Sequence, residues 1–269
     1  MTSARVPKRT DILGPALNCG VHPLLHSVEH RPWPLPSGPW VMAQTWHDLL
    51  FAHWPLPEAV MRPLVPAQLK LDTFDGQCWA GVIPFHMSAI RGRGLPPLPG
   101  LSRFPELNVR TYVTFGGKPG VYFFSLDAGN LPAVWAARTF YHLPYFHAAM
   151  SSKESSGTID YCSRRLRSAA EFRGQYRPTA EPCLRGKGLR AKGSIERWLT
   201  ERYCLYTTHR GEVYRGEIHH RPWPLQDAEA EIEINTVAAA AGIPLPSAAP
   251  LLQFARRLEV LIWPLRRAE

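Results

Sequence analysis

Short runs of apolar residues, many of them alternating with polar ones and bounded by proline or glycine, dominate this chain. Because strand side chains point alternately to opposite faces, such runs predict β-strands. The runs lie at residues 40–46, 80–85, 109–115, 121–126, 158–162, 205–208, 213–214 and 231–234. The glycine-rich stretch 116–120 predicts a hairpin turn between two of them. Many strands with few helices favour a curved or closed antiparallel sheet.

Two segments have helical character instead. Residues 57–65 predict a short helix, because Pro57 suits a first helical turn and Pro63 helps to end it. Residues 133–141 are rich in alanine, which favours a second helix. The predicted class is α+β, mainly β, with a few short helices.

The N-terminal part differs from the rest. Proline recurs through residues 1–38, and apolar periodicity is weak there. Proline fixes φ and removes a backbone donor, so we expect a flexible, extended tail. Residues 39–269 are then expected to form a single domain, which should stay folded when the tail is removed.

Composition narrows the function classes. Hydrophobic residues make up 45% of the chain, enough for a sizeable core. The net charge is +9, and 25 of the 31 basic residues are arginine. The arginines are scattered, and no helix-turn-helix, zinc-finger or RNA-binding signature accompanies them. A solvated basic surface is therefore favoured over nucleic-acid binding.

Cysteines and apolar runs bear on location. The five cysteines are odd in number and widely spaced, with no CxxC pair, so neither a disulfide framework nor a zinc site is expected. The chain shows no signal-peptide pattern and no membrane-length apolar run. We expect a cytoplasmic protein without metal, cofactor or membrane contact.

The sextet His-Arg-Pro-Trp-Pro-Leu occurs twice, at residues 30–35 and 220–225. The flanking residues do not match, so this is not an architectural repeat. Each copy predicts a proline-stiffened corner anchored by its tryptophan. The alternative is that both copies bind one partner that recognises aromatic side chains.

Several separate motifs resemble one known family. They are residues 46–54 (WHDLLFAHW), 71–76 (LDTFDG), 199–206 (LTERYCLY) and 217–220 (EIHH). In this order they resemble the YqjF-like family of uncharacterised bacterial proteins, from about Trp40 to the C-terminus. That family supplies no settled activity.

A wider likeness covers residues 105–150. Residues 105–113 and 137–148 resemble the core of the acetoacetate decarboxylase-like superfamily, in which a strand glutamate faces a Schiff-base lysine. Glu106 matches the glutamate, whereas Tyr145 occupies the lysine position. A phenol cannot form an imine with a ketone, so Schiff-base decarboxylation is not expected. The resemblance implies a conical β-barrel with peripheral helices, closed by residues 257–263.

The strand that contains Glu106 suggests a site. Alternation puts Glu106, Asn108 and Arg110 on one face, where a carboxylate, an amide and a guanidinium could meet a small polar or anionic ligand. The alternative is a Glu106–Arg110 pair that satisfies only itself. The expected ligand-binding residues are Glu106, Asn108, Arg110, Tyr145, His142 and His53, and the candidates for catalysis are Glu106 and Tyr145.

Other polar residues are weighed as structural. A histidine among apolar neighbours, such as His47 or His53, is more often a buried structural residue than a ligand. Glu217 and His219 share a strand face, but a metal needs a third convergent ligand. Glu201 and the adjacent Arg202 point to opposite faces, so at most one of them can reach the pocket.

The leading interpretation is a protein that binds a small polar or anionic molecule in a central pocket, without Schiff-base chemistry. One alternative is an enzyme acting on a small carbonyl or carboxylate compound through Glu106 and Tyr145. A second alternative is an interaction scaffold with a basic surface. The sequence also leaves a homo-oligomer open.

Overall fold

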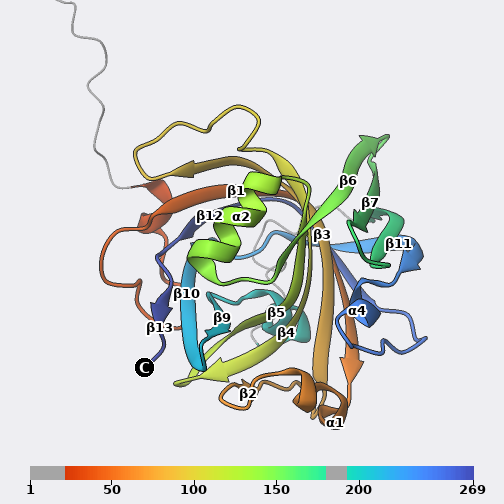
Figure 1. The fold of residues 1–269 in the computed structure, drawn as a ribbon, viewed down its shortest axis with the longest axis horizontal. Coiled ribbons are helices and arrows are strands. Elements are labelled where there is room, and N and C mark those ends of the chain that lie inside the picture. The colour runs from red at the N-terminus through yellow and green to blue at the C-terminus, as the bar shows by residue number, and fades with distance from the viewer. Residues whose placement is uncertain (1–21, 180–192) are drawn as a thin grey trace, which may run out of the picture.

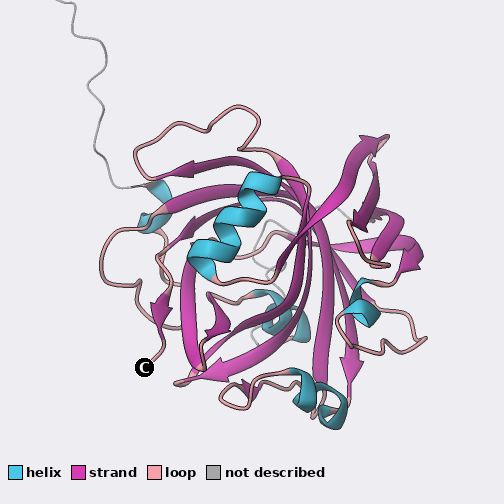
Figure 2. Ribbon diagram, in the orientation of Figure 1, coloured by secondary structure: helices cyan, strands magenta, loops and turns pink. Residues whose placement is uncertain are grey.

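The computed structural model describes residues 22–179 and 193–269, and strands account for most of them (Figure 2). The strands are β1 (Met42–Leu56), β2 (Lys70–Leu71), β3 (Cys78–Gly92), β4 (Phe104–Phe115), β5 (Lys118–Ala128), β6 (Tyr145–Ser155), β7 (Thr158–Arg165), β8 (Glu171–Pro178), β9 (Cys204–His209), β10 (Glu212–His220), β11 (Leu225–Asn235), β12 (Leu251–Ile262) and β13 (Arg266–Arg267). The helices are α1 (Glu58–Met61), α2 (Leu131–Tyr141), α3 (Ile195–Thr200) and α4 (Val237–Ala240), with 3-10 turns η1 (Pro23–His26) and η2 (Arg62–Leu64). Within these ranges, no helix is long and apolar enough to cross a bilayer.

Seven of these strands form a closed circuit of hydrogen-bonded pairs, in the order β4, β5, β9, β10, β12, β1, β3 and back to β4. In Figure 1 the orange β1 lies beside the dark blue β12. These two strands pair, with Met42 opposite Ile262, although they lie near opposite ends of the chain. Strands β6, β7, β8 and β11 make a second connection between β5 and β12. The mainly β class with few helices is confirmed, and the strands close into a ring.

Two pairings depart from the antiparallel sheet that the sequence predicted. Strand β5 runs parallel to both β6 and β9. Parallel neighbours need a crossover connection, because a tight turn can join only antiparallel strands. The connection from β5 to β6 contains helix α2 and is a crossover of this kind, which allows β6 to run in the same direction as β5.

Both predicted helices are present, as α1 followed by η2 and as α2. Two strands are longer than predicted. Strand β1 continues to Leu56, and β12 begins at Leu251, six residues before the predicted start at residue 257. In β1, every residue from Leu49 to Ala52 is buried, so both of its faces pack against protein. A strand buried on both faces has a continuous apolar run instead of an alternating one.

The two faces of β1 lie in different parts of the core. Leu50, Ala52 and Trp54 belong to one apolar cluster, whereas Leu49 and Phe51 belong to another. The second cluster also contains apolar residues of β3 and β12 and has the Tyr145 ring packed against it. The face of the sheet that contributes Leu49 and Phe51 to this second cluster is therefore the one that carries the candidate site.

The N-terminal segment differs from the expected tail over residues 22–38. Leu24 is 4% exposed and packs with Leu261 and Trp263. The buried Arg31 donates a 2.7 Å hydrogen bond from Nη1 to the Ile218 carbonyl. The prolines of this segment leave no periodic pattern of apolar residues that would predict its packing. Individual side chains such as Leu24 and Arg31 nevertheless fix it to the strands. The remainder of the expected tail, residues 1–21, lies outside the described residues.

These contacts predict that the segment stabilises the domain. Replacing Leu24 with alanine removes buried apolar atoms and leaves a cavity, so the free energy of unfolding should fall by about 2–4 kcal/mol. Urea denaturation measures this change. Val28→Ala, at a side chain that is 37% exposed, is the matched control and should change the free energy by less than about 0.5 kcal/mol. A change for Leu24→Ala as small as that expected of the control would show that the contacts of Leu24 add no stability.

Candidate functional site

The polar face of β4 points to the second apolar cluster. Glu106, Asn108 and Arg110 alternate along the strand and pair across it with Phe85, Ile83 and Gly81 of β3. Residues that pair directly share a face, so the three polar side chains stand beside apolar rings and methyl groups. Glu106 and Asn108 are each 4% exposed. The three residues therefore share one face of β4, as alternation predicted.

Glu106 and Tyr145 are in direct contact. The Tyr145 hydroxyl donates a 2.6 Å hydrogen bond to Glu106 Oε2. Burial raises the pKa of Glu106 to about 7, against opposing hydrogen bonds from Tyr145 and Asn108, and the charge of Asp127 raises it further. Burial, followed by the charge of Glu106, raises the pKa of Tyr145 well above its usual value. At neutral pH the phenol is thus a donor, and the carboxyl is the group that can exchange a proton.

Arg110 has no carboxylate partner among the described ion pairs, so the alternative of a Glu106–Arg110 pair is not what forms. Its guanidinium lies 5.6 Å from the centre of the Phe51 ring and 5.7 Å from that of Tyr112. Its buried Nε has no hydrogen-bond partner in the structure that is described. The guanidinium of Arg110 is therefore a cation that lies against two aromatic rings and has an N–H group available to bind a further acceptor.

His53 lies at the same level of the ring. It is fully buried, and its Nε2 is 2.6 Å from the Tyr112 hydroxyl. Burial, together with the charge of Arg110, lowers its pKa well below the usual value, so the ring is neutral near pH 7. Gly81 makes room for it, because a Cβ at that position would lie 2.9 Å from His53 Nε2.

Gln253 is a member of this face that sequence reasoning missed. It pairs with Phe51 across β1 and β12 and therefore shares its face. Gln253 is 1% exposed, and within the described structure neither Oε1 nor Nε2 has a hydrogen-bond partner. The sequence feature that could have revealed it is a single amide side chain within the apolar run 251–255. It was missed because the predicted closing strand began only at residue 257.

His142 does not join the group. It ends α2 with a positive φ of 52°, and its ring stacks on His209 at a centroid distance of 3.9 Å. Its carbonyl accepts a 2.7 Å hydrogen bond from Thr207 Oγ1. Leu143 and Pro144 separate this cap from Tyr145, which is the first residue of β6. Proximity to Tyr145 in the sequence was therefore misleading for the position of His142.

The other polar candidates have partners elsewhere in the structure. The His47 ring stacks on His86 at 4.8 Å, and Arg202 hydrogen-bonds to Asp72. Glu201 accepts a hydrogen bond from the backbone amide of Trp223. No group of three or more histidine, cysteine, aspartate or glutamate side chains in the described ranges could hold a metal ion.

Comparison with known proteins identifies the family. The model of DUF2071, described as an uncharacterized conserved protein, matches residues 43–259. The chain belongs to the DUF2071 family. It is 53% identical over 234 residues to the uncharacterized protein YqjF of Bacillus subtilis strain 168, a match that covers 87% of this chain and 95% of that protein. The resemblance to YqjF-like proteins is thus confirmed.

Solved structures of acetoacetate decarboxylase-like proteins share the fold of this DUF2071 member. An acetoacetate decarboxylase-like enzyme from Sphingomonas wittichii RW1 superposes with a TM-score of 0.58 at 14% identity, covering 86% of this chain and 94% of the enzyme. The enduracididine biosynthesis enzyme MppR complexed with pyruvate gives 0.57 at 8% identity, covering 86% and 91%. Acetoacetate decarboxylase from Legionella pneumophila gives 0.57 at 10% identity, covering 90% and 93%. At these identities the likeness establishes a shared fold.

The pKa of Glu106 predicts how stability depends on pH. Between its ordinary value of 4.5 and about 7, the folded protein holds a proton that the unfolded chain has released. Stability should therefore fall as the pH rises through this window and then level off, by up to about 3 kcal/mol for this group. Glu106→Gln stays neutral and should be more stable than the wild type at pH 8, with a smaller difference at pH 5.

Urea denaturation at both pH values tests this expectation. Glu231→Gln, at an exposed position of β11, is the matched control and should leave the pH dependence unchanged. A Glu106→Gln difference that is the same at pH 5 and pH 8 would contradict the raised pKa.

Proposed function

We propose that this protein binds a small carboxylate-bearing molecule inside the ring of strands, without Schiff-base chemistry. The observation that carries the proposal is a set of buried polar atoms without hydrogen-bond partners in the described structure. On the face that includes Glu106, these atoms are Asn108 Oδ1, Arg110 Nε, His53 Nδ1, and Gln253 Oε1 and Nε2. Each unpaired buried polar atom costs about 1–3 kcal/mol, so a group of them on one face is a costly arrangement that a ligand would relieve.

The charge of this face favours an anion. Arg110 contributes a permanent positive charge, and His53 is neutral because its pKa is lowered well below the usual value. Glu106 can be protonated near neutral pH, since its pKa is about 7. A carboxylate ligand near Arg110 would further favour the protonated form of Glu106. Binding should therefore be coupled to proton uptake and weaken above pH 7.

The surroundings favour a small ligand. Phe51, Ile83, Phe85 and Ala128 lie among the polar groups, and the Tyr145 hydroxyl stands at one end of the row. Such a site would bury a short carbon chain between apolar groups while a few polar atoms fix its orientation. The ring of strands is proposed to form the conical barrel of the acetoacetate decarboxylase fold around it. MppR, whose structure contains pyruvate, has the same fold.

Isothermal titration calorimetry with pyruvate and with acetoacetate tests the proposal. At least one of them should bind at pH 6 and bind more weakly at pH 8. Arg110→Met removes the cation, and a hydrogen bond to a charged group is worth about 1.5–3 kcal/mol, so affinity should fall about 10- to 100-fold. Gln253→Leu should weaken binding by a smaller factor.

Arg173→Met is the matched control, because this arginine is on the outside of β8, where it pairs with Glu233. It should bind both acids like the wild type. Unchanged affinity in Arg110→Met, or binding of neither acid by a folded protein, would contradict the proposal.

The lack of Schiff-base chemistry has its own test. Treatment with acetoacetate and borohydride should leave the intact mass unchanged, because Tyr145 has no amine to condense with a ketone. An authentic acetoacetate decarboxylase serves as the positive control. Among the described lysines, Lys70 and Lys153 are exposed, and Lys118 forms an ion pair with Glu217. A substrate-dependent adduct on any lysine would overturn this part of the proposal.

Acid–base catalysis is a second candidate function, and the Glu106–Tyr145 contact is what favours it. A carboxyl with a pKa of about 7 is well matched to proton transfer at neutral pH. Tyr145 is a donor in this scheme and not an acid of lowered pKa, since its pKa is shifted upward. Exchange of the methyl protons of pyruvate with deuterium, lost in Glu106→Gln, would identify this activity.

The scaffold alternative is supported by a surface feature of α2. Trp135 and Phe140 are each 63% exposed, and their rings meet edge to face at 6.1 Å. An exposed aromatic pair of this kind is typical of a contact surface. It lies on the outer face of the helix, so a partner there would not compete with a ligand in the ring.

A further inference from the structure

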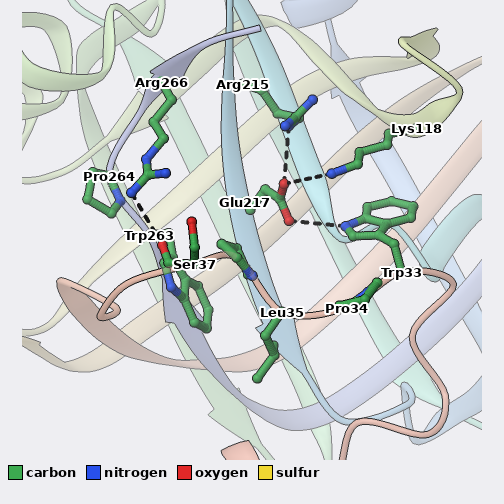
Figure 3. Close-up of a pocket in the computed structure, with 11 residues that line it drawn as sticks. Trp33, Pro34, Leu35, Ser37, Lys118, Arg215, Glu217, Trp263, Pro264 and Arg266 are labelled. Atoms are coloured by element: carbon green, nitrogen blue, oxygen red, sulfur yellow. Dashed lines mark hydrogen bonds and ion pairs between the residues drawn. The ribbon is translucent and has the colours of Figure 1, made fainter. Parts of the chain in front are cut away.

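The two copies of the repeated sextet have different environments. Trp223 of the second copy is 5% exposed and stacks on Trp46 at 6.0 Å, so it fills the core. Trp33 of the first copy is only partly buried and lines a surface pocket (Figure 3). One sequence therefore builds a core corner in one place and a pocket wall in the other.

Arg31 holds the pocket wall in place. Its side chain is 1% exposed and lies 4.9 Å over the Tyr203 ring. Besides the bond to Ile218, its Nε donates to the Trp33 carbonyl at 3.3 Å. His30 adds a 2.7 Å contact from Nε2 to the His220 carbonyl. The wall is thus fixed to β10 before any ligand binds.

The pocket has a volume of about 370 Å³, which is within the usual range for small-molecule sites. Its apolar walls are Trp33, Leu35 and Trp263, and its charged groups are Lys118, Arg215, Arg266 and Glu217. Figure 3 shows Lys118 and Arg215 reaching one oxygen of the Glu217 carboxylate while the indole nitrogen of Trp33 reaches the other.

The charges of the pocket do not cancel. Lys118 Nζ and Arg215 Nε are each 3.2 Å from Glu217 Oε1. Trp33 Nε1 donates to Oε2 at 3.0 Å, and Arg31 Nη2 is 3.5 Å from the same oxygen. A single carboxylate is therefore surrounded by three cations. Lys118 and Arg215 have further N–H groups that can bind a second anion.

We infer that this pocket binds a small aromatic carboxylate. Its ring would lie between Trp33 and the apolar side chains of Leu35 and Trp263, where contact between aromatic rings adds to the gain from burying apolar area. Its carboxylate would meet Lys118 and Arg215, whose excess charge over Glu217 favours an anion. An aromatic amine of the same shape would instead be repelled.

This site is separate from the interior of the ring. Lys118 begins β5, whereas Glu106 pairs with Ala128 at the end of the same strand. The ten residue steps from Lys118 to Ala128 span about 33 Å at the rise of an extended strand. A ligand in the pocket therefore does not touch Glu106 or Tyr145, and the inference does not depend on the function proposed for the interior.

Fluorine NMR of protein labelled with 5-fluorotryptophan can follow the pocket alone. The Trp33 resonance is assigned by its loss in Trp33→Phe. Titration with sodium benzoate should shift it saturably, whereas benzylamine at equal concentration should not. The double variant Lys118→Gln/Arg215→Gln should weaken benzoate binding at least tenfold, measured on the same resonance.

Arg173→Met removes a charge from the outside of β8 and is the control for general electrostatic effects; it should leave the benzoate titration unchanged. Benzoate that shifts other tryptophans but not Trp33 would overturn the inference. An unweakened titration in the double variant, or a benzylamine shift as large as that of benzoate, would also overturn it.

Discussion

Closure of the strand circuit is the constraint on which the rest of the structure depends. The parallel pairing of β5 with β9 and the short pairing of β10 with β12 complete the ring. Once the ring is closed, each strand has an inner and an outer face, and every second residue is committed to one of them. The row from Glu106 to Arg110 becomes an interior feature for this reason. A sheet left open at either pairing would expose the same row to water, where these polar groups need no partners.

Burial inside the ring gives ordinary side chains unusual properties. Desolvation disfavours charge, which moves the pKa of Glu106 up to about 7 and that of His53 down. The guanidinium of Arg110 lies beside them, against the aromatic rings of Phe51 and Tyr112. The face that includes Glu106 therefore carries the Arg110 guanidinium beside groups that are neutral or easily neutralised. This imbalance, more than any single residue, is the basis for proposing that the face binds an anion.

The N-terminal segment contributes a second, different kind of order. Residues 30–35 have no helical or strand periodicity, yet Arg31 and Leu24 fix the segment through side-chain contacts with β10 and β12. Prolines limit the conformations of the unfolded segment, so less entropy is lost when it docks. The result is a rigid wall beside Glu217, placed on the outside of the ring. The molecule thus carries polar chemistry on both sides of one sheet, and a strand's length separates the two.

The sequence by itself determined the mainly β class, both main helices, the shared face of Glu106, Asn108 and Arg110, and the absence of a lysine at position 145. These properties follow from alternation along one strand or from the residue at one position. Only the tertiary structure decided that Gln253 joins this face, that His142 does not, and that residues 22–38 pack on the domain. Gln253 reaches its place through the pairing of β12 with β1, about 200 residues earlier in the chain. Such partners are chosen by the closure of the whole ring, and local patterns carry no information about which distant strand will lie alongside.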